Sequence, residues 1–497
     1  MISALVLIIV TAFLIYYILK PKLPPNFPPG PANFPIVGGS LFLSKIGKNT
    51  HDAFHKLGDL YGPLTGLYLG NLPAIVINGY EQAKELFARD DFNHRPSIFS
   101  VSYPWGGRAL GVFFSNGRLW QENRRFALRH LRDFGFGKTS MEGLIHEEAE
   151  ECIETMNKEL KKTKDSVITI HDKFGVSVIN ILWAIMGGTR YRHDDEEFKK
   201  MLNVIQESFR SGSPSGNLVN AYPFLRHFPY FKQNFQALVS GAEAIIEMLE
   251  KSIEEHKKNR DPSAPRDLID VYLQAIEDSK DDPDTVFFKD QLVQLCEDLF
   301  AAGAESTSNS IAFCILHMVR NPDCQEKVQK ELDAVVGKNR FPSFEDKANL
   351  PYTFAVISEA FRISPVAPIS VPHMNIEDTK LLGYNVPKGT SVMVNFPSIN
   401  LDKKYWGDPE VFRPERFLDE SGNFIKAKLD HVHGFGAGKR QCLGEPLARM
   451  SNYLLVAAVL QRFKFEIVPG QPKPTTDPID GFTIAPQPFS AKVTPRY

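Results

Sequence analysis

The sequence predicts a mainly α-helical protein with small β-sheets, built as one large body behind a short apolar N-terminal segment. Its composition is that of a globular chain, because 43% of the 497 residues are hydrophobic and 23% are charged. Most of the chain fits a helical pattern, and no second linker, repeat or low-complexity tract follows residue 36. We therefore expect a single domain over residues 37–497, although a chain of this length more often holds about three.

Charge and cysteine usage exclude several classes of protein. The chain has 57 basic and 59 acidic residues, so it lacks the excess positive charge expected of a nucleic-acid-binding protein. Its five cysteines are scattered and form no C-x-x-C pair, which argues against a disulfide scaffold, a zinc ribbon or a redox dithiol. These observations favour a large enzyme of a reducing compartment.

The N-terminus predicts a membrane anchor over residues 1–20. Ile2–Leu19 is an uncharged run that would span about 27 Å as a helix, enough for a thin bilayer such as that of the endoplasmic reticulum. A cleavable signal peptide is the alternative, but no Lys or Arg precedes the run and no small-x-small cleavage site follows it. Lys20 and Lys22 place the rest of the chain in the cytosol by the positive-inside rule. We expect an uncleaved anchor in the endoplasmic reticulum membrane, with the large body facing the cytosol.

A proline-rich hinge is predicted over residues 21–36. Seven prolines interrupt any helix there and favour a stiff, extended conformation. We interpret this segment as a spacer that orients the body on the membrane.

A long buried helix is predicted over residues 291–320, because apolar residues occur on nearly all of its faces. Its middle, from Ala302 to Thr307, holds a glycine, an acid and two hydroxyls, which are costly inside an apolar helix. Two interpretations stay open at this point. Gly303 is either a notch into which a neighbouring helix packs, or a local opening of the helix beside a reactive centre.

A glycine-rich loop that presents a cysteine is the strongest functional signal in the chain. Cys442 follows the loop and stands where a helix with an apolar stripe begins. The adjacent Lys439 and Arg440, together with free backbone amides, are expected to lower the pKa of this cysteine and favour its thiolate. Phe435 is expected to cover the sulfur. The glycines of the loop are Gly434, Gly436 and Gly438.

This loop does not match a phosphate-binding loop. A Walker sequence needs glycine five residues before Gly438, where His433 stands, and Ser or Thr after Lys439, where Arg440 stands. The dinucleotide fingerprint G-x-G-x-x-G is also incomplete from either possible first glycine. A glycine-rich loop with one thiolate is better suited to axial ligation of haem iron.

These residues resemble the cytochrome P450 family. Phe435–Gly444 matches its haem-binding signature F-x-x-G-x-R-x-C-x-G without a gap. Glu359–Arg362 is similar to the E-x-x-R of the family, Phe412–Phe417 to its F-x-P-E-R-F, and Trp120–Arg124 to its W-x-x-x-R helix. The anchor and the P-P-G-P hinge at Pro28–Pro31 are similar to microsomal members, in particular the vertebrate family-two type and its insect relatives. The resemblance covers essentially the whole chain and implies the cytochrome P450 fold around a buried haem.

The resemblance implies the roles of individual residues. Cys442 is the expected axial ligand of the haem iron, and a thiolate there pushes electron density onto iron and favours cleavage of the O–O bond. The other expected haem contacts are Trp120, Arg124, His373 and Arg440 at the propionates, and Phe435, Gly436 and Ala302 around the cofactor. The expected catalytic residues, on a proton path along the distal helix, are Glu305, Ser306 and Thr307.

One catalytic position departs from the family pattern. Members of the family usually have threonine directly after the acid, whereas Ser306 follows Glu305 here and Thr307 comes next. Serine keeps the hydroxyl but lacks the methyl group that restricts its rotamers. Monooxygenation is expected to survive this change with leakier coupling to NADPH.

Three charged residues are expected to be structural rather than catalytic. Glu359 and Arg362 lie one helical turn apart and therefore on one face. With Arg416 they can form a bidentate charged network, which the family uses to hold the core beside the haem.

The implied activity is that of a monooxygenase that inserts one oxygen atom of O2 into a lipophilic molecule, by hydroxylation or epoxidation. Its implied cofactor is haem b, with O2 and NADPH as co-substrates. No flavin, nicotinamide or iron–sulfur motif is present, so the electrons are expected from NADPH–cytochrome P450 reductase, with cytochrome b5 as a second donor. Basic residues near the proximal side are expected to attract that acidic partner. They are Arg118, Arg124, Arg125, Arg129, Arg132, Lys439 and Arg440.

The pocket positions implied by the resemblance are mainly apolar, which predicts a lipophilic substrate with few polar anchors. They are Phe113, Phe300, Ala301, Ala304, Val366, Val371 and Phe482, each of which can equally be plain core. The stretch Arg129–Gly137 resembles insect members close to the methyl farnesoate epoxidases, so a sesquiterpenoid hormone precursor is one candidate and a dietary or xenobiotic lipophile another. Two other activities stay open: a thiolate-haem isomerase or dehydratase, and a non-enzymatic haem sensor.

Overall fold

The computed structural model describes residues 23–212 and 218–497, which form a mainly helical body with small β-sheets, as predicted. The helices are α2 (Ser40–Ile46), α3 (Thr50–Tyr61), α4 (Tyr80–Ala88), α5 (Phe99–Ser102), α6 (Gly117–Asp133), α7 (Glu142–Leu160), α8 (Gly175–Met186), α9 (Glu196–Ser211), α10 (Leu218–Ala221), α11 (Pro229–Asn259), α12 (Leu268–Asp278), α13 (Lys289–Arg320), α14 (Pro322–Val335), α15 (Pro351–Ile363), α16 (Pro397–Asn400), α17 (Lys403–Trp406) and α18 (Glu445–Arg462). The strands are β1 (Leu64–Leu69), β2 (Leu72–Ile77), β3 (Val167–Thr169), β4 (His373–Met374), β5 (Thr379–Leu381), β6 (Tyr384–Val386), β7 (Ser391–Val394), β8 (Phe463–Glu466), β9 (Pro478–Ile479), β10 (Ala485–Pro486) and β11 (Ser490–Pro495).

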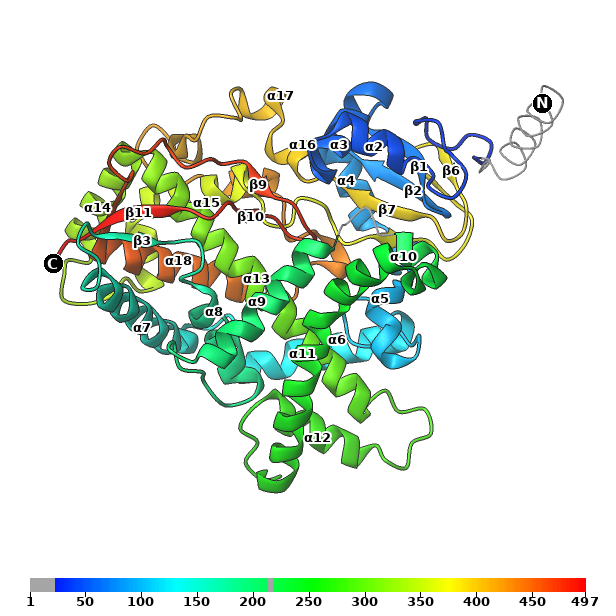
Figure 1. Ribbon diagram of the computed structural model, residues 1–497, viewed down its shortest axis with the longest axis horizontal. Helices are drawn as coiled ribbons and strands as arrows, with labels where there is room; N and C mark the ends of the chain where they lie inside the picture. The colour runs from blue at the N-terminus through cyan, green and yellow to red at the C-terminus, as the bar shows by residue number, and fades with distance from the viewer. Residues whose placement is uncertain (1–22, 213–217) are drawn as a thin grey trace.

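The long helix α13 crosses the middle of the helical body (Figure 1). It runs from Lys289 to Arg320, close to the predicted limits, and its side chains are buried around most of its circumference. Helices α8, α11, α15 and α18 pack against it, and the largest hydrophobic core surrounds it. A helix that is apolar on nearly all faces needs such a covering, because it has no continuous polar face for water.

The β-rich end of the molecule lies beside the start of the described chain (Figure 1). Its sheet has the strand order β1-β2-β7-β4, with β2 and β7 parallel and the other neighbours antiparallel. In β2, Ile75 and Ile77 are buried in one core and Ala74 and Val76 in another, because alternate residues of a strand face opposite sides. The smaller sheets have the orders β3-β11-β8, β5-β6 and β10-β9.

The described part of the proline-rich hinge packs on the body. In its described part, from residue 23, Phe27 is buried in a hydrophobic cluster of the β-rich end. Gly66 of β1 donates its N–H to the carbonyl oxygen of Pro29 at 2.9 Å. A side chain at Gly30 would collide with the backbone of Gly66, so the two segments lie in direct contact. Burial of a large aromatic side chain favours this docked arrangement over an extended spacer in water.

The predicted anchor over residues 1–20 lies outside the described residues. Within residues 23–212 and 218–497, the structure contains no helix that combines the length and the apolar character needed to cross a bilayer.

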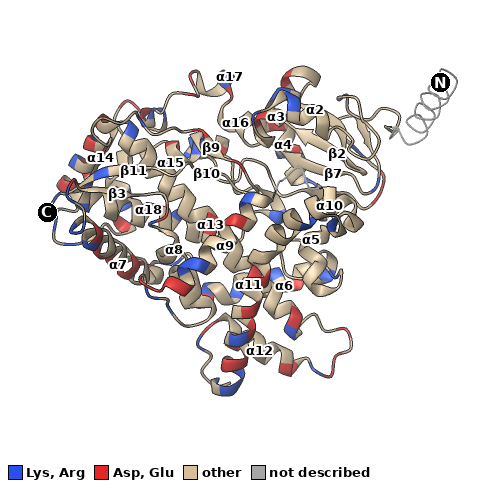
Figure 2. Ribbon diagram, in the orientation of Figure 1, with Lys and Arg blue, Asp and Glu red and all other residues tan. Residues whose placement is uncertain are grey.

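Basic and acidic side chains are interspersed over the outer helices, including α7, α11 and α12 (Figure 2). This mixture agrees with a formal charge of only −2 for the chain. A surface of this kind attracts partners through local clusters of charge rather than through net charge.

Candidate active site

The cysteine loop is closed by its own backbone. Cys442 lies between a short 3-10 turn, Gly438–Arg440, and α18, and its N–H donates to the carbonyl oxygen of Phe435 at 2.8 Å. Gly438 has a φ of 71°, and a side chain built there would lie 2.1 Å from the carbonyl oxygen of Phe87. Only glycine fits this position. The loop is therefore held in one shape and presents the cysteine in front of α18.

Phe435 ties the loop to two helices of the core. Its ring stacks on Phe361 of α15 with centroids 4.9 Å apart, and the guanidinium of Arg449 of α18 lies 4.8 Å from its centroid. Gly436 has a φ of 68°, and no atom lies within 4 Å of a side chain built there. The loop thus combines a fixed aromatic ring with an open backbone surface.

The pKa of Cys442 is raised rather than lowered, which corrects the prediction. Although the residue is exposed on one side, the surrounding protein raises the pKa of the thiol, and this is the largest effect. The backbone N–H groups of Gly444 and Glu445 and the charge of Arg124 favour the thiolate but do not outweigh that burial.

The two cations expected to act on the sulfur are engaged elsewhere. Lys439 pairs with Asp90, with 2.7 Å between Nζ and Oδ2. Arg440 donates to the carbonyl oxygens of Asn93 at 2.7 Å and Ser115 at 2.8 Å. Because a bound metal ion deprotonates a coordinating thiol outright, a thiolate at Cys442 is expected to depend on iron rather than on these neighbours.

Three arginines gather beside the loop without a carboxylate partner among the described residues. The guanidinium of Arg440 lies 3.6 Å above the ring of Trp120, and Arg95 and Arg124 donate to backbone carbonyl oxygens. Burial, together with repulsion from the neighbouring arginines, lowers the pKa of Arg440 to about 8; burial and the charge of Arg124 lower that of Arg95 to about 9. The cluster therefore lacks negative charge from the described chain.

The cluster fits the carboxylates of a haem. Arg95 Nε and Trp120 Nε1 are buried donors without a hydrogen-bond partner in the described chain. Buried donors and uncompensated cations beside a cysteine match a haem whose iron is bound by Cys442 and whose two propionates need charged partners. The sequence pointed to Trp120, Arg124 and Arg440 but missed Arg95, because no family motif marks that position.

The propionate contact expected of His373 stays a prediction. It is buried in β4, and its Nδ1 lies 2.9 Å from the carbonyl oxygen of Phe92. Burial, together with the positive charges of Arg95 and Arg440, holds the pKa of His373 well below its ordinary value. Because a carbonyl oxygen only accepts, Nδ1 carries a proton in this contact.

The middle of α13 presents a small open face. Ala302 is exposed and Ser306, one turn later, is half-buried. Ser306 donates its hydroxyl to the carbonyl oxygen of Ala302 at 2.7 Å. Thr307 is buried, so the structure separates it from the open face that Ala302 and Ser306 share.

Glu305 is held by two side chains that the sequence analysis did not foresee as its partners. Arg210 of α9 donates to Glu305 Oε1 at 2.6 Å, and Asn309 donates to the same oxygen at 2.7 Å. Glu305 is buried, and its Oε2 has no partner among the described residues. The acid is therefore turned toward α9.

Gly303 is a packing notch. A side chain built there would lie 2.6 Å from a methyl group of Leu182 in α8. The helix is α-helical without interruption from Lys289 to Arg320. Of the two interpretations, the structure therefore favours the packing notch, with Leu182 in the space that glycine leaves free.

The residues predicted to line a pocket differ in how far they are buried. Phe113 and Phe482 are half-buried with ring centroids 6.1 Å apart, and Ala301 and Val371 are also half-buried. Phe300 is fully buried with its ring 5.6 Å from that of Trp183, so it belongs to the core and not to a pocket. Ala304 and Val366 are buried as well.

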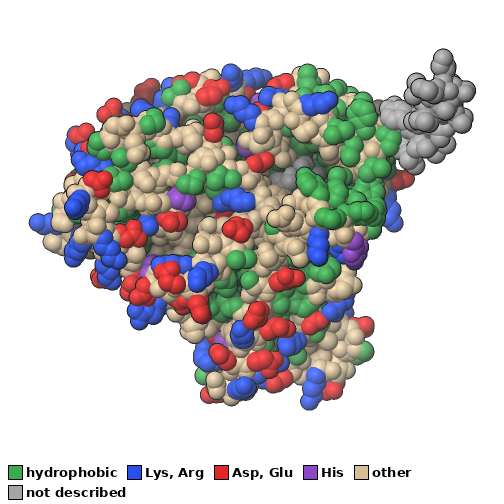
Figure 3. All heavy atoms as spheres, in the orientation of Figure 1, with side chains coloured by type: hydrophobic (Ala, Val, Ile, Leu, Met, Phe, Trp, Pro, Cys, Tyr) green, Lys and Arg blue, Asp and Glu red, His purple; other side chains and the backbone are tan. Residues whose placement is uncertain are grey.

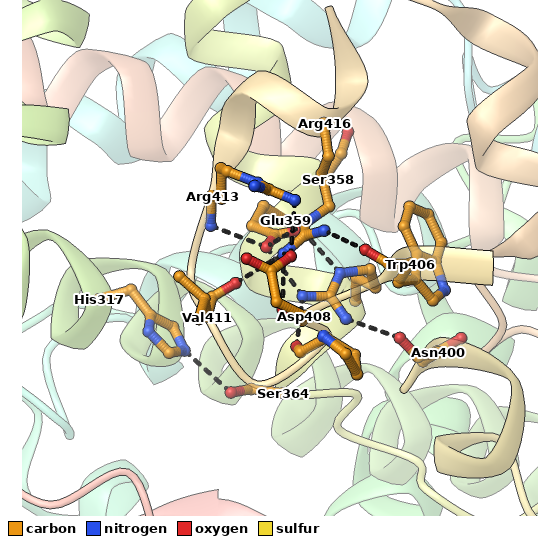
Figure 4. Close-up of polar contacts among 12 residues, drawn as sticks. His317, Ser358, Glu359, Ser364, Asn400, Trp406, Asp408, Val411, Arg413 and Arg416 are labelled. Carbon is orange, nitrogen blue, oxygen red and sulfur yellow. Dashed lines mark hydrogen bonds and ion pairs between the residues drawn. The ribbon is translucent and has the colours of Figure 1, made fainter. Parts of the chain in front are cut away.

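Glu359, Arg362 and Arg416 meet in the buried network expected of them. Figure 4 shows Glu359 and Arg416 within it. Arg362 binds both carboxylate oxygens of Glu359, with distances of 2.7 and 2.8 Å, and Arg416 Nε lies 3.0 Å from the same carboxylate. Arg362 also donates to the carbonyl oxygens of Asn400 at 2.6 Å and Pro409 at 2.8 Å. The network joins α15 to the segment that precedes the cysteine loop.

The basic residues expected at the proximal side are only partly available to a partner. Arg440 is buried, Arg124 is half-buried beside the cysteine loop, and Lys439 pairs with Asp90. Arg118 pairs with Glu122. The remaining residues are exposed on α6: Arg125, Arg129 and Arg132.

Comparison with known proteins agrees with this geometry. A family model described as Cytochrome P450 matches residues 28–493. A farnesoate epoxidase of Bombyx mori is 35% identical over 496 residues, which are 99% of this chain and 99% of that protein. Cytochrome P450 2D15 of Canis lupus familiaris is 35% identical over 477 residues, 95% of this chain and 93% of that protein. Cytochrome P450 2C16 of Oryctolagus cuniculus is 36% identical over 471 residues, 93% of each chain. The chain therefore belongs to the cytochrome P450 family and is a P450 monooxygenase that uses haem and O2 on lipophilic substrates.

Proposed function

We propose that this monooxygenase hydroxylates or epoxidises an isoprenoid-like lipophile, with electrons from NADPH through NADPH–cytochrome P450 reductase. The observation that carries the substrate class is the similarity to a farnesoate epoxidase over 99% of both chains. The half-buried rings of Phe113 and Phe482 support it, because aromatic lining suits an apolar, unsaturated guest.

The residues around the cysteine divide the work of holding the cofactor. Cys442 would bind the iron, and Arg95, Arg124 and Arg440 would neutralise the propionates and fix the orientation of the ring. When bound, haem supplies the activation of O2 at its iron. Phe435 and the closed loop keep the cysteine in place.

Ser306 is proposed to order water on the proton path. Because its hydroxyl proton is donated to the carbonyl oxygen of Ala302, its oxygen is free to accept a bond from water on the open face of α13. Glu305 lies next to it and is proposed to take part, while Thr307 is buried and is given no direct part in this path.

The proposed activity is tested with the haem-loaded protein, reductase, NADPH and isotopically labelled O2. Isoprenoid substrates are expected to gain one labelled oxygen atom, and only when NADPH and reductase are both present. Rearranged product without NADPH would instead favour the isomerase or dehydratase. Haem binding without turnover of any lipophile would favour the sensor.

Replacing Ser306 by alanine is expected to divert electrons to peroxide and to lower product formed per NADPH several-fold. The variant loses the hydroxyl that orders water, so protons reach oxygen less selectively. Peroxide and product are measured in the same reaction. Ser308→Ala is the matched control, because Ser308 makes the same bond to the preceding turn, at 2.8 Å from the Ala304 carbonyl oxygen, but is buried. Unchanged coupling in Ser306→Ala would contradict the assigned role.

The reductase is proposed to bind at the exposed arginines of α6. Arg125, Arg129 and Arg132 are exposed, and α6 contacts the cysteine loop through Arg124. An acidic partner would therefore arrive close to Cys442. Cytochrome b5 is a second acidic protein that we propose for the same surface.

An apolar patch supports a location at the endoplasmic reticulum membrane. Hydrophobic side chains gather at the β-rich end of the molecule (Figure 3). Tyr222 donates its hydroxyl to the carbonyl oxygen of Ile36 at 3.1 Å, which joins the two segments that form the patch. Its exposed residues are Phe34, Ile36, Leu41, Leu72, Phe224, Phe228 and Tyr230. With the anchor predicted for residues 1–20, we propose that this patch rests in the bilayer with the body in the cytosol.

Substituting Ile36→Asp or Phe228→Asp is expected to weaken vesicle binding by about tenfold in a chain that starts at residue 23. These side chains are 58% and 54% exposed, and burying such a residue is worth about 1.5–3 kcal/mol. Binding is measured by flotation with phosphatidylcholine vesicles. Val411→Asp is the control, because Val411 is 51% exposed outside the patch. Equal binding of all three variants would contradict the proposed surface.

A further inference from the structure

A charged pair joins two helices next to residues that are proposed to line the substrate pocket. Arg210 of α9 and Glu305 of α13 lie 2.6 Å apart, and their side chains are 23% and 1% exposed. Asn309 also donates to Glu305, which fixes the carboxylate on α13. The pair is therefore neutral as a whole and is held in a largely buried place.

The segment that carries Arg210 adjoins the aromatic residues that are proposed to line the pocket. Phe482 donates its N–H to the carbonyl oxygen of Phe209, the residue before Arg210, at 2.9 Å. The ring of Phe482 lies 6.1 Å from that of Phe209 and 6.1 Å from that of Phe113. A side chain built at Gly481 would lie 3.2 Å from the Cα atom of Arg210. The backbone of Arg210 thus lies directly beside the segment that carries Phe482.

Arg210 has hydrogen-bond donors that Glu305 does not use. A guanidinium carries five N–H groups, and within the described residues Arg210 uses one nitrogen, toward Glu305. It can therefore donate to a ligand without leaving Glu305. A carboxylate ligand would place a second negative charge beside Glu305 in a water-poor site, whereas an ester, ketone or hydroxyl oxygen adds no charge.

Resting on the proposed function, we propose that Arg210 is the polar anchor of the substrate and that Glu305 makes it select an uncharged oxygen acceptor over a carboxylate. Arg210 and Glu305 together determine specificity for the polar end of the substrate. Phe113, Phe209 and Phe482 contact its apolar part. Glu305 acts in this role through the charge that it places on Arg210.

Binding to the haem-loaded full chain tests the assignment without turnover. The probes are a fifteen-carbon isoprenoid acid and its methyl ester, measured by equilibrium dialysis and by the shift of the haem absorption band. In the wild type the ester is expected to bind at least about tenfold more tightly than the acid. In Glu305→Gln the acid is expected to bind more tightly than the ester, because the charge of Arg210 is no longer neutralised.

Two further variants complete the test. Arg210→Gln is expected to weaken the binding of the ester, and to weaken the binding of the acid more strongly, because Glu305 then lacks its cationic partner. Glu207→Gln is the matched control, because Glu207 is exposed on the same helix, and its ester-to-acid ratio is expected to equal that of the wild type.

An equal ester-to-acid ratio in the wild type and Glu305→Gln would overturn the assignment. If Glu305→Gln failed to hold haem, an unchanged acid affinity in Arg210→Gln would overturn it as well. Failure of the proposed function looks different: neither probe would bind, or no isoprenoid would be oxygenated with reductase. If isoprenoids are oxygenated but the ester-to-acid affinity ratio does not change in the Arg210 and Glu305 variants, only the role proposed for these two residues is wrong.

Discussion

Replacing Cys442 by alanine is expected to abolish the thiolate-haem spectrum and to remove monooxygenase activity. The variant keeps the closed loop, because the backbone N–H of residue 442 still reaches the carbonyl oxygen of Phe435. It loses the only sulfur that the loop presents. Since removal of even an outer partner of a metal ligand costs about 10–100-fold, loss of the ligand itself is expected to cost more than about 100-fold in turnover.

The measurements are haem content, the spectrum of the reduced carbon monoxide complex, and product formed with reductase. Cys324→Ala is the matched control, because Cys324 is half-buried on α14 and takes no part in the loop. It is expected to keep the carbon monoxide band after which the family is named. A Cys442→Ala protein that retained this band and full turnover would disprove thiolate ligation by this residue.

Replacing Arg362 by alanine is expected to lower the free energy of unfolding by about 3–5 kcal/mol, because it leaves a buried carboxylate without its main partner. Arg362 and Glu359 are each 0% exposed. The change also frees the carbonyl oxygens of Asn400 and Pro409, which Arg362 now satisfies. Denaturant unfolding and retention of haem measure the loss.

Arg413→Gln is the control for this network. Arg413 stands in the same segment and its backbone N–H contacts Glu359, but its side chain is 47% exposed and pairs with Asp408. A surface pair of this kind contributes little to stability, so the variant is expected to unfold close to the wild type. Equal stability of the Arg362 and Arg413 variants would show that burial does not govern the network.

Features that depend on local spacing were predictable from the sequence. The limits of α13, the place of Cys442 after its glycine loop, and the shared face of Glu359 and Arg362 all follow from residue types at fixed intervals. The match to the cytochrome P450 family rests on the same intervals and is confirmed by a family model over residues 28–493.

Partners far apart in the sequence were not predictable. Glu305 and Arg210 are 95 positions apart, and only the packing of α9 on α13 brings them together. Arg95 joins the cationic cluster because it is buried beside Val371, which is 276 positions away. Nothing in its immediate neighbours distinguishes it from a surface arginine.

The sequence by itself determined the family, the position of the candidate cysteine ligand and the helical framework, because these follow from local geometry and from residue types that few other structures require. Tertiary structure alone decided that Gly303 is a notch for Leu182, that Phe300 is core, and that the pKa of Cys442 is raised. Each of these depends on which atoms the fold brings against the residue, and those contacts set both the available space and the cost of removing water.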